Sequence, residues 1–360
     1  MKICFIAPAN SAHIIKWCSW FHARGHRIDV ISFTEGDIPG TEVHLIDAGV
    51  DTEGSDIGKL KYLFTGSKIK KTVSKIRPDV INVHYATSYG MAVALSGLQG
   101  YVLSVWGSDI YDFPNKSFFH KMLLKYSLKK AKKLFSTSHA MAEEASKYTN
   151  KEFAITPFGV DMELFRPSRR TRDNTDPAFI IGTVKTLAPL YGIDYILEAM
   201  AIIKKDYPWC PVKARIAGNG PQEQELKQRA KDLDIQEHVC FLGKIPQEQA
   251  AVEWANMDVA VIPSVAFESF GVAAVEAQAS GTPVIISDVE GLKETTNPGK
   301  TSIIVPRKNA QAIAEAVIYL YQNPDVYQKM KIESRSYAVS KYELDNCFVN
   351  IENLLGQLSS

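Results

Sequence analysis

The sequence predicts an α/β protein built from two doubly wound, parallel-sheet domains. Three observations lead to this prediction. Short apolar runs alternate with helical patterns along most of the 360 residues, which is typical of repeated βα units. The alternation breaks at residues 157–177, in a stretch rich in Pro, Asp and Arg. Because 46% of the residues are apolar, each half can bury a core of its own.

The first domain is expected over residues 1–160, with a helix near residues 14–24. Its strand-like runs are residues 2–7, 27–33, 80–84, 101–105 and 134–137. Residues 116–133, between the last two runs, form a basic helical segment. Strands that alternate with helices in this way predict a parallel sheet.

A linker is expected at residues 161–177, followed by a second domain at residues 178–336. The strand-like runs of this domain are residues 179–184, 212–217, 239–242, 259–262, 284–286 and 303–305. The helical stretch 337–360 has no strand after it and is expected to pack back on the first domain. Since ligands bind such sheets at the carboxyl ends of the strands, the site is expected in a cleft between the two domains.

Composition excludes several classes of protein. A net charge of +1 argues against a dedicated nucleic-acid binder. No apolar run approaches the roughly 18 residues of a membrane span, and Ile3–Ala7 is too short for a signal-peptide core. Five widely spaced cysteines without a CxxC pair are expected to be reduced, buried thiols rather than a disulfide framework or a zinc site: Cys4, Cys18, Cys210, Cys240 and Cys347. A soluble, cytoplasmic protein is expected.

Two segments of the first domain, residues 59–77 and 116–133, are basic and lack acidic residues. In the second segment the lysines recur at helical spacing and form one stripe, which consists of Lys121, Lys125, Lys129 and Lys132 or Lys133. Apolar side chains lie beside this stripe: Phe118, Phe119, Met122, Leu123 and Leu128. One interpretation is a solvated surface helix. The other is peripheral docking on the anionic inner face of a membrane.

The segment FESFGVAAVEAQASG, residues 267–281, is the most informative about function. A buried strand is expected to end near Pro263, and a helix to run from Gly271 to Ala279, so that Ser269, Phe270 and Gly271 form the junction. The first N–H groups of a helix have no intrahelical partner and the helix dipole is positive there, which favours a phosphate.

Glu268 stands just before this helix and Glu276 lies about a turn and a half inside it. Two carboxylates beside a phosphate site suit a sugar nucleotide, one holding sugar hydroxyls and the other the ribose. Alternatively, both belong to the solvated face of an amphipathic helix. The segment closely resembles the signature of the family 4 retaining glycosyltransferases, which pairs two glutamates at this spacing and continues as A-x-A-x-G-x-P-V-I, here residues 277–285.

Two further motifs of the second half share this resemblance. Gly218 and Gly220 belong to the sequence AGNGP, which follows a predicted strand. Taken alone, these residues indicate a plain tight turn. The resemblance implies that the turn shapes the nucleotide side of the cleft. Lys185 follows the strand 179–184 and is either a surface lysine or a diphosphate ligand. The family usually has an arginine and a lysine here, whereas this chain has Thr183 and Leu190-Tyr191-Gly192, so Lys185 is the best remaining cation.

The first domain departs further from the family pattern. Residues 106–109, WGSD, match the family's HGxD-like element at every position except the first, where Trp106 replaces the histidine; Asp109 is the matching aspartate. His84, at the end of the preceding strand, either supplies a similar imidazole or caps its strand. The glycines of the family's acceptor-side loop are also missing from residues 8–13. There Ser11 and His13 are acceptor-side candidates, and the alternative for His13 is a helix-start cap. These departures put the usual sugar contact in doubt.

The resemblance implies a GT-B fold and retaining transfer of a sugar from a nucleotide-sugar donor, expected to be UDP-linked, to a glycan, lipid-linked or other hydroxyl acceptor. Lys185 and the N–H groups at Phe270-Gly271-Val272 would hold the diphosphate, with Ser269 beside them; Glu268 would bind sugar hydroxyls and Glu276 the ribose. The leaving phosphate would take the acceptor proton.

No cofactor and no metal are required in this scheme. The one Asp-x-Asp, Asp232 to Asp234, falls near a helix end away from these junctions and is a poor metal site. Two alternatives remain open: a non-catalytic partner subunit of a glycosyltransferase pair, and a sugar-nucleotide epimerase on the same fold.

Overall fold

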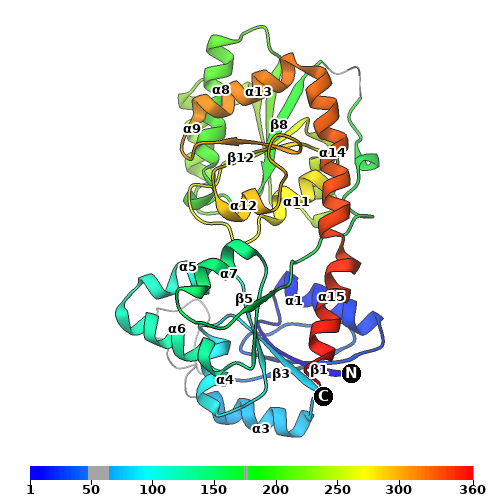
Figure 1. Ribbon diagram of the computed structural model, residues 1–360. Coiled ribbons are helices and arrows are strands. Elements are labelled where there is room, and N and C mark those ends of the chain that lie inside the picture. The colour runs from blue at the N-terminus through cyan, green and yellow to red at the C-terminus, as the bar shows by residue number, and fades with distance from the viewer. Residues whose placement is uncertain (48–64, 174, 176, 360) are drawn as a thin grey trace. The chain divides into compact units, whose positions relative to one another are not determined.

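The computed structural model describes all residues except 48–64, 174, 176 and 360. The chain forms two compact units, which are Met1–Phe158 with Asp345–Ser360, and Gly159–Leu344 (Figure 1). Each unit contains one sheet in which all the pairings between strands are parallel. The predicted α/β class with two parallel-sheet domains is confirmed.

The sheet of the first unit has the strand order β3-β2-β1-β4-β5-β6-β7. Its strands are β1 (Lys2–Ile6), β2 (Arg27–Ser32), β3 (Thr41–Leu45), β4 (Val80–His84), β5 (Val102–Val105), β6 (Lys133–Ser136) and β7 (Phe153–Ile155). The two edge strands, β3 and β7, were not predicted. Both are short and incompletely buried, so neither has the continuous apolar run that marks an inner parallel strand.

Eight-to-thirteen-residue helices connect most of these strands: α1 (Ala12–Ala23), α3 (Gly66–Ile76), α4 (Tyr89–Ser96), α6 (Phe118–Lys130) and α7 (His139–Ser146), with the shorter α5 (Ser108–Tyr111). Residues 59–64 of the first basic segment lie outside the described part of the chain. Ser117 and Ser138 begin α6 and α7 as N-caps, each accepting a hydrogen bond from a backbone N–H of the first turn.

Helix α6 differs from the expected basic stripe at two places. It ends at Lys130 because Ala131 is extended, so Lys132 lies beyond the helix and does not extend the stripe. Leu128 was expected on the apolar surface but is fully buried in the core. Phe118, Phe119 and Met122 are exposed as expected.

The second unit contains the six predicted strands in the order β10-β9-β8-β11-β12-β13. They are β8 (Phe179–Val184), β9 (Val212–Ala217), β10 (Val239–Gly243), β11 (Val259–Ile262), β12 (Val284–Ser287) and β13 (Ser302–Val305). The helices are α8 (Ile193–Asp206), α9 (Glu223–Asp232), α10 (Gln247–Asn256), α11 (Val272–Ala279), α12 (Glu290–Glu294), α13 (Ala310–Gln322) and α14 (Pro324–Tyr342). Helices α8 and α13 pack side by side (Figure 1).

The C-terminal helical stretch is divided between the units. Helix α14 ends at Tyr342 because Glu343 is extended, and α15 (Leu344–Gly356) follows. Residues 337–342 therefore belong to the second unit, whereas α15 packs on α1 of the first, with the Phe348 ring 5.6 Å from that of Trp17. Glu352 accepts a hydrogen bond from the Arg24 guanidinium at 2.9 Å on the same interface.

The cysteines are free thiols, and four of them are buried. Cys240 is exposed, so the expectation that every thiol is buried is wrong at this position. It lies on β10, the edge strand of the second sheet, whose side chains are only partly covered. Among the described residues, no helix is long and apolar enough to cross a membrane.

Candidate active site

The topology of the second sheet brings two loops together. Strands β8 and β11 are neighbours, but the chain leaves β8 toward β9 on one side and leaves β11 toward β12 on the other. Loops after such a pair of strands diverge, and the crevice at their carboxyl ends is the usual ligand site of a doubly wound sheet. Lys185 follows β8, and Glu268 lies in the loop after β11.

Lys185 and Glu268 form a buried ion pair at this position. Lys185 Nζ lies 2.7 Å from Glu268 Oε1, and the two side chains are 14% and 10% exposed. The same Oε1 accepts a hydrogen bond of 2.8 Å from Ser264 Oγ. The lysine ammonium also lies 4.3 Å from the centre of the Tyr191 ring, a cation–π distance. The cation is thus held between a carboxylate and an aromatic face.

The AGNGP turn holds the backbone of Lys185. Gly218 has φ +133°, and a Cβ at this residue would lie 1.8 Å from the carbonyl oxygen of Lys185. A Cβ at Gly220 would lie 2.3 Å from the carbonyl oxygen of Leu187. Both glycines are therefore needed for close approach to residues 185–187, and they act on the candidate site by positioning Lys185.

Helix α11 begins at Val272, one residue later than expected. Gly271 is its N-cap with φ +75°, a left-handed conformation that glycine adopts without strain. The N–H groups of Ala274 and Val275 already bond to the Gly271 carbonyl, so the groups left for an anion are those at the very start of the helix. Phe270 is buried, with its ring 5.4 Å from that of Tyr342.

Glu276 is half-buried on α11. Its Oε2 accepts a hydrogen bond of 3.2 Å from the indole Nε1 of Trp254, a fully buried residue of α10. The indole of Trp254 thereby fixes the orientation of the Glu276 carboxylate. The sequence did not assign these roles to Trp254, Ser264 or Tyr191. Trp254 reaches Glu276 from a different helix, 22 residues away, whereas Ser264 and Tyr191 lie within six residues of Glu268 and Lys185, in loops whose conformation has no regular period to predict it.

His84 occupies the carboxyl end of β4 in the first unit, and this residue is fully buried. Its ring packs against those of Trp17 and Trp106 at 5.0 and 4.5 Å, and neither nitrogen has a hydrogen-bond partner in the described structure. Burial, with a smaller effect of the nearby His13 charge, lowers the pKa of His84 to about 3. The imidazole is therefore neutral at pH 7, and a ligand cannot reach it in this arrangement.

The other first-unit candidates gather around Trp106. His13 is the second residue of α1, whose N-cap is Ser11, so it is not a helix cap. Its ring stacks on Phe158 at 4.0 Å and meets the Trp106 ring at 5.6 Å. Burial lowers the pKa of His13 to about 4, with a smaller contribution from Lys16. Ser11 ends the loop after β1, and His13 lies in the first turn of α1.

Asp109 is buried and binds backbone. It accepts hydrogen bonds from the N–H groups of Ala86, Trp106 and Gly107 at 2.9, 3.2 and 2.8 Å. Burial raises the pKa of its carboxyl, and these hydrogen bonds oppose the shift. The side chain ties the loop after β4 to the loop after β5, which makes it a positioning residue for Trp106.

Comparison with known proteins identifies the family of both units. The model for "Glycosyl transferases group 1" matches residues 166–337, and that for "Glycosyl transferase 4-like" matches residues 2–138. The phosphatidyl-myo-inositol mannosyltransferase of Mycobacterium leprae is 32% identical over 95% of this chain and 93% of its own length. The D-inositol 3-phosphate glycosyltransferase of Corynebacterium urealyticum is also 32% identical, but this chain spans about half of that protein, 51%.

Solved structures share the fold. The sucrose-phosphate synthase of Thermosynechococcus elongatus has a TM-score of 0.84 at 20% identity, with 99% of each chain covered. HepE of Anabaena, solved with UDP, has a TM-score of 0.80 at 19% identity and covers 99% of this chain and 100% of its own. The chain therefore belongs to the group 1 glycosyltransferases and has their GT-B fold of two Rossmann-like domains.

Proposed function

We propose that this chain is a retaining, metal-independent glycosyltransferase that moves a sugar from a nucleotide-sugar donor to a hydroxyl acceptor in glycoconjugate biosynthesis. The observation that carries the proposal is the buried Lys185–Glu268 pair, 2.7 Å apart, in the loops that follow β8 and β11. It places a cation and a carboxylate together where a doubly wound sheet binds ligands.

In the proposed reaction, the bond between the sugar anomeric carbon and the diphosphate oxygen breaks while the acceptor oxygen bonds to the same carbon. Lys185 and the first N–H groups of α11, from Gly271 and Val272, stabilise the negative charge that develops on the diphosphate. The acceptor proton passes to the leaving phosphate oxygen. Attack from the face that the diphosphate leaves gives retention. Because these groups supply the positive charge, the proposal needs no divalent ion.

The carboxylates bind the neutral parts of the donor. Glu268 accepts hydrogen bonds from sugar hydroxyls, with Ser264 fixing its orientation, and Glu276 accepts hydrogen bonds from the ribose, with Trp254 fixing its orientation. Ser269 and Phe270 form the loop between the two sites. On the acceptor side, Ser11 and His13 flank the incoming hydroxyl and Asp109 holds the adjacent loops, whereas His84 serves as an apolar wall beneath Trp106.

The donor base is tested by a thermal-shift screen with UDP, GDP, ADP and their sugar conjugates. UDP is the first choice, since HepE of the same fold binds it, and GDP is the second, since a relative from Mycolicibacterium smegmatis is named for its dependence on GDP-mannose. A ligand at 100 times its Kd stabilises the native state by about 2.7 kcal/mol, so we expect the melting temperature to rise by several degrees with one base only.

Glu276→Ala is expected to abolish this shift, and Glu248→Ala, which changes an exposed glutamate of α10, is expected to preserve it. Transfer that continues in EDTA would support the metal-independent scheme. The absence of any shift would instead favour a non-catalytic partner subunit, the alternative that the Trp106 replacement and the inaccessible His84 support.

The acceptor is proposed to lie at an anionic membrane surface contacted by α6. Phe118, Met122 and Tyr126 recur every four residues and are 79%, 49% and 36% exposed. Exposed lysines at 121, 125 and 129 form a parallel stripe beside them. An exposed apolar ridge bordered by cations matches a helix that lies in the plane of a membrane surface. The chain would then act as a peripheral protein on the cytoplasmic face, on a lipid-linked acceptor.

We expect the double change Lys125→Glu and Lys129→Glu to weaken binding to phosphatidylglycerol vesicles at least tenfold, because each juxtamembrane lysine contributes about 1 kcal/mol. Cosedimentation at several vesicle concentrations measures this loss. The matched control reverses two exposed lysines of the second unit, Lys244 and Lys300, and should bind like the parent protein. Equal binding by both double variants, or equal binding to phosphatidylcholine vesicles, would remove α6 as the docking surface.

A further inference from the structure

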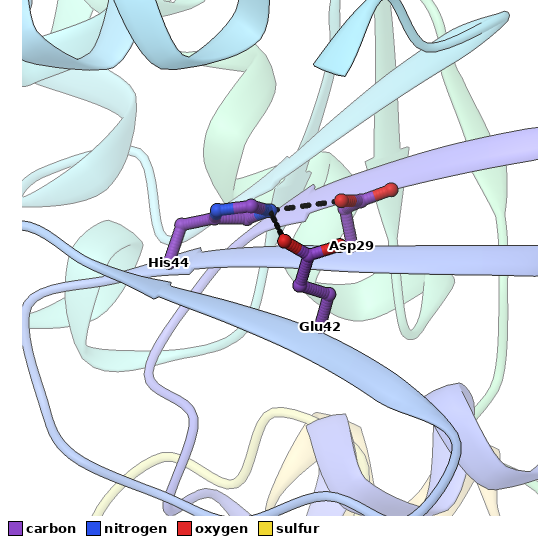
Figure 2. A group of neighbouring side chains, drawn as sticks. All are labelled: Asp29, Glu42 and His44. Atoms are coloured by element: carbon purple, nitrogen blue, oxygen red, sulfur yellow. Dashed lines mark hydrogen bonds and ion pairs between the residues drawn. The ribbon is translucent and has the colours of Figure 1, made fainter. Parts of the chain in front are cut away.

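Two neighbouring strands of the first unit carry a cluster of side chains that bind metals in other proteins. Asp29 of β2 and Glu42 of β3 are register partners, and His44 follows two residues after Glu42. Register partners and residues two apart on a strand project from the same face of a sheet. The three side chains consequently point toward one another (Figure 2), and one ligand atom from each lies within 4.8 Å of the others.

The distances suit a single small ion. His44 Nε2 lies 2.8 Å from Asp29 Oδ1 and 3.9 Å from Glu42 Oε1. Ligand atoms held at about 2.0–2.2 Å from a tetrahedral ion lie roughly 3.3 Å apart, a value between the two observed separations. The Glu42 side chain is 63% exposed, so it can rotate to close the larger gap without disturbing the core.

The buried member of the cluster has an unsatisfied atom. The Asp29 side chain is 2% exposed, and its Oδ2 has no hydrogen-bond partner in the described structure. The nearest cation is Lys2, whose Nζ is 3.8 Å away and donates to the carbonyl oxygen of Ile76. His44 meets the other oxygen, Oδ1. The buried carboxylate is therefore only partly compensated, and a cation bound to it would lower the cost of its burial.

We propose that Asp29, Glu42 and His44 bind a divalent transition-metal ion, with Zn²⁺ the best match. One imidazole and two carboxylates suit zinc better than Ca²⁺ or Mg²⁺, which prefer six or more oxygen ligands. Water would complete the coordination on the exposed side. Arg27 lies 3.7 Å from Glu42 but is 68% exposed, so it can move away when the ion binds.

The role of this ion is structural. β3 is the edge strand of the sheet, and Glu42 and His44 would be fixed through the metal to Asp29 on the inner strand β2. The groups proposed for diphosphate and sugar binding belong to the second unit, so the ion is expected to stabilise the first unit and to leave the chemistry of transfer unchanged.

The test is isothermal titration of the EDTA-treated, dialysed 360-residue chain with ZnCl₂, with parallel melting curves. We expect one ion per chain, a higher melting temperature with zinc, and no comparable effect of MgCl₂ or CaCl₂. Changing even a residue that only orients a metal ligand typically costs about 10–100-fold in affinity. Loss of a ligand should cost at least as much, so Glu42→Gln should bind at least about tenfold more weakly and His44→Ala at least about a hundredfold. His120→Ala, which changes a histidine of α6 outside the cluster, is the control.

Glu42→Gln changes an exposed side chain and should fold normally even if His44→Ala does not. Zinc binding of equal affinity in the parent protein, Glu42→Gln and His44→Ala would place the ion elsewhere and overturn the proposal. The absence of binding at about 0.1 mM zinc would overturn it as well, because structural zinc sites bind far more tightly than this.

Discussion

Lys185→Ala should lower kcat for sugar transfer by about a thousandfold, the largest loss of activity expected from any single change in this chain. Removing one preorganised donor from a developing anion typically costs 10²–10³ in rate. Lys185 is the one side-chain cation that contacts Glu268 in the described structure, so its loss would leave only the N–H groups of α11 to stabilise the diphosphate. Steady-state kinetics with the donor identified by the thermal-shift screen measures the effect, which should fall on kcat more than on KM.

The same change also removes one partner of a buried ion pair, which typically destabilises a protein by about 3 kcal/mol. The double variant Lys185→Ala, Glu268→Gln removes both charges, so it should regain part of that stability without regaining activity. Lys227→Ala, in the more exposed pair with Glu223, is the matched control and should change both quantities little. Transfer within twofold of the parent rate in Lys185→Ala would contradict the assignment of the leaving-group cation.

Gly218→Ala is expected to have the largest effect on stability. Its Cβ would lie 1.8 Å from the carbonyl oxygen of Lys185, and its φ of +133° is unfavourable for alanine. Backbone strain and overpacking each cost about 1–3 kcal/mol, so a loss of about 3 kcal/mol or more is expected. Urea unfolding of the second unit measures it. Because the clash would displace Lys185, transfer should also fall in the fraction that remains folded, though by less than in Lys185→Ala.

Gly299→Ala separates the two contributions to this loss. Gly299 belongs to the same unit and also has a positive φ, +77°, but a Cβ there meets no atom within 4 Å. Its substitution should cost only the conformational strain, about 1 kcal/mol. If Gly218→Ala and Gly299→Ala lowered the free energy of unfolding equally, the close approach between the AGNGP turn and Lys185 would contribute nothing to the loss of stability.

The sequence predicted the inner strands well because a strand buried on both faces must be apolar along its length. The inner strands β8, β11 and β12 of the second sheet have this property, and the partly covered edge strand β10 was predicted as well because its run VCFL is apolar in sequence. Strands β3 and β7 were not predicted, since an edge strand can form without a continuous apolar run: β3 reads TEVHL, and β7 has only three residues. The break between α14 and α15 was missed for a related reason: Glu343 becomes extended without a proline or glycine to signal it.

For the candidate site, the motif placed Lys185 and Glu268 in loops that the strand order brings together. Their contact depends on the topology of the sheet, which no local pattern specifies. Ser264 and Tyr191 meet Glu268 and Lys185 within the same loops, and their contacts depend on loop conformations that the sequence pattern does not specify. Trp254 meets Glu276 through the packing of α10 on α11. The burial of His84 could not be predicted because an imidazole at the end of a parallel strand can face a ligand or the core, and the aromatic rings around it come from separate elements.

The packing of α15 on α1 has a consequence for how the protein is made. Trp20 donates a hydrogen bond to Asp345, 325 residues along the chain, and Phe348 covers Trp17. Until the ribosome has passed α15, the aromatic surface of α1 lacks this cover, although the residues of the whole second unit have already been synthesised. Folding of the first unit must therefore either wait for the second or proceed with an exposed apolar face, a state open to chaperones and to aggregation.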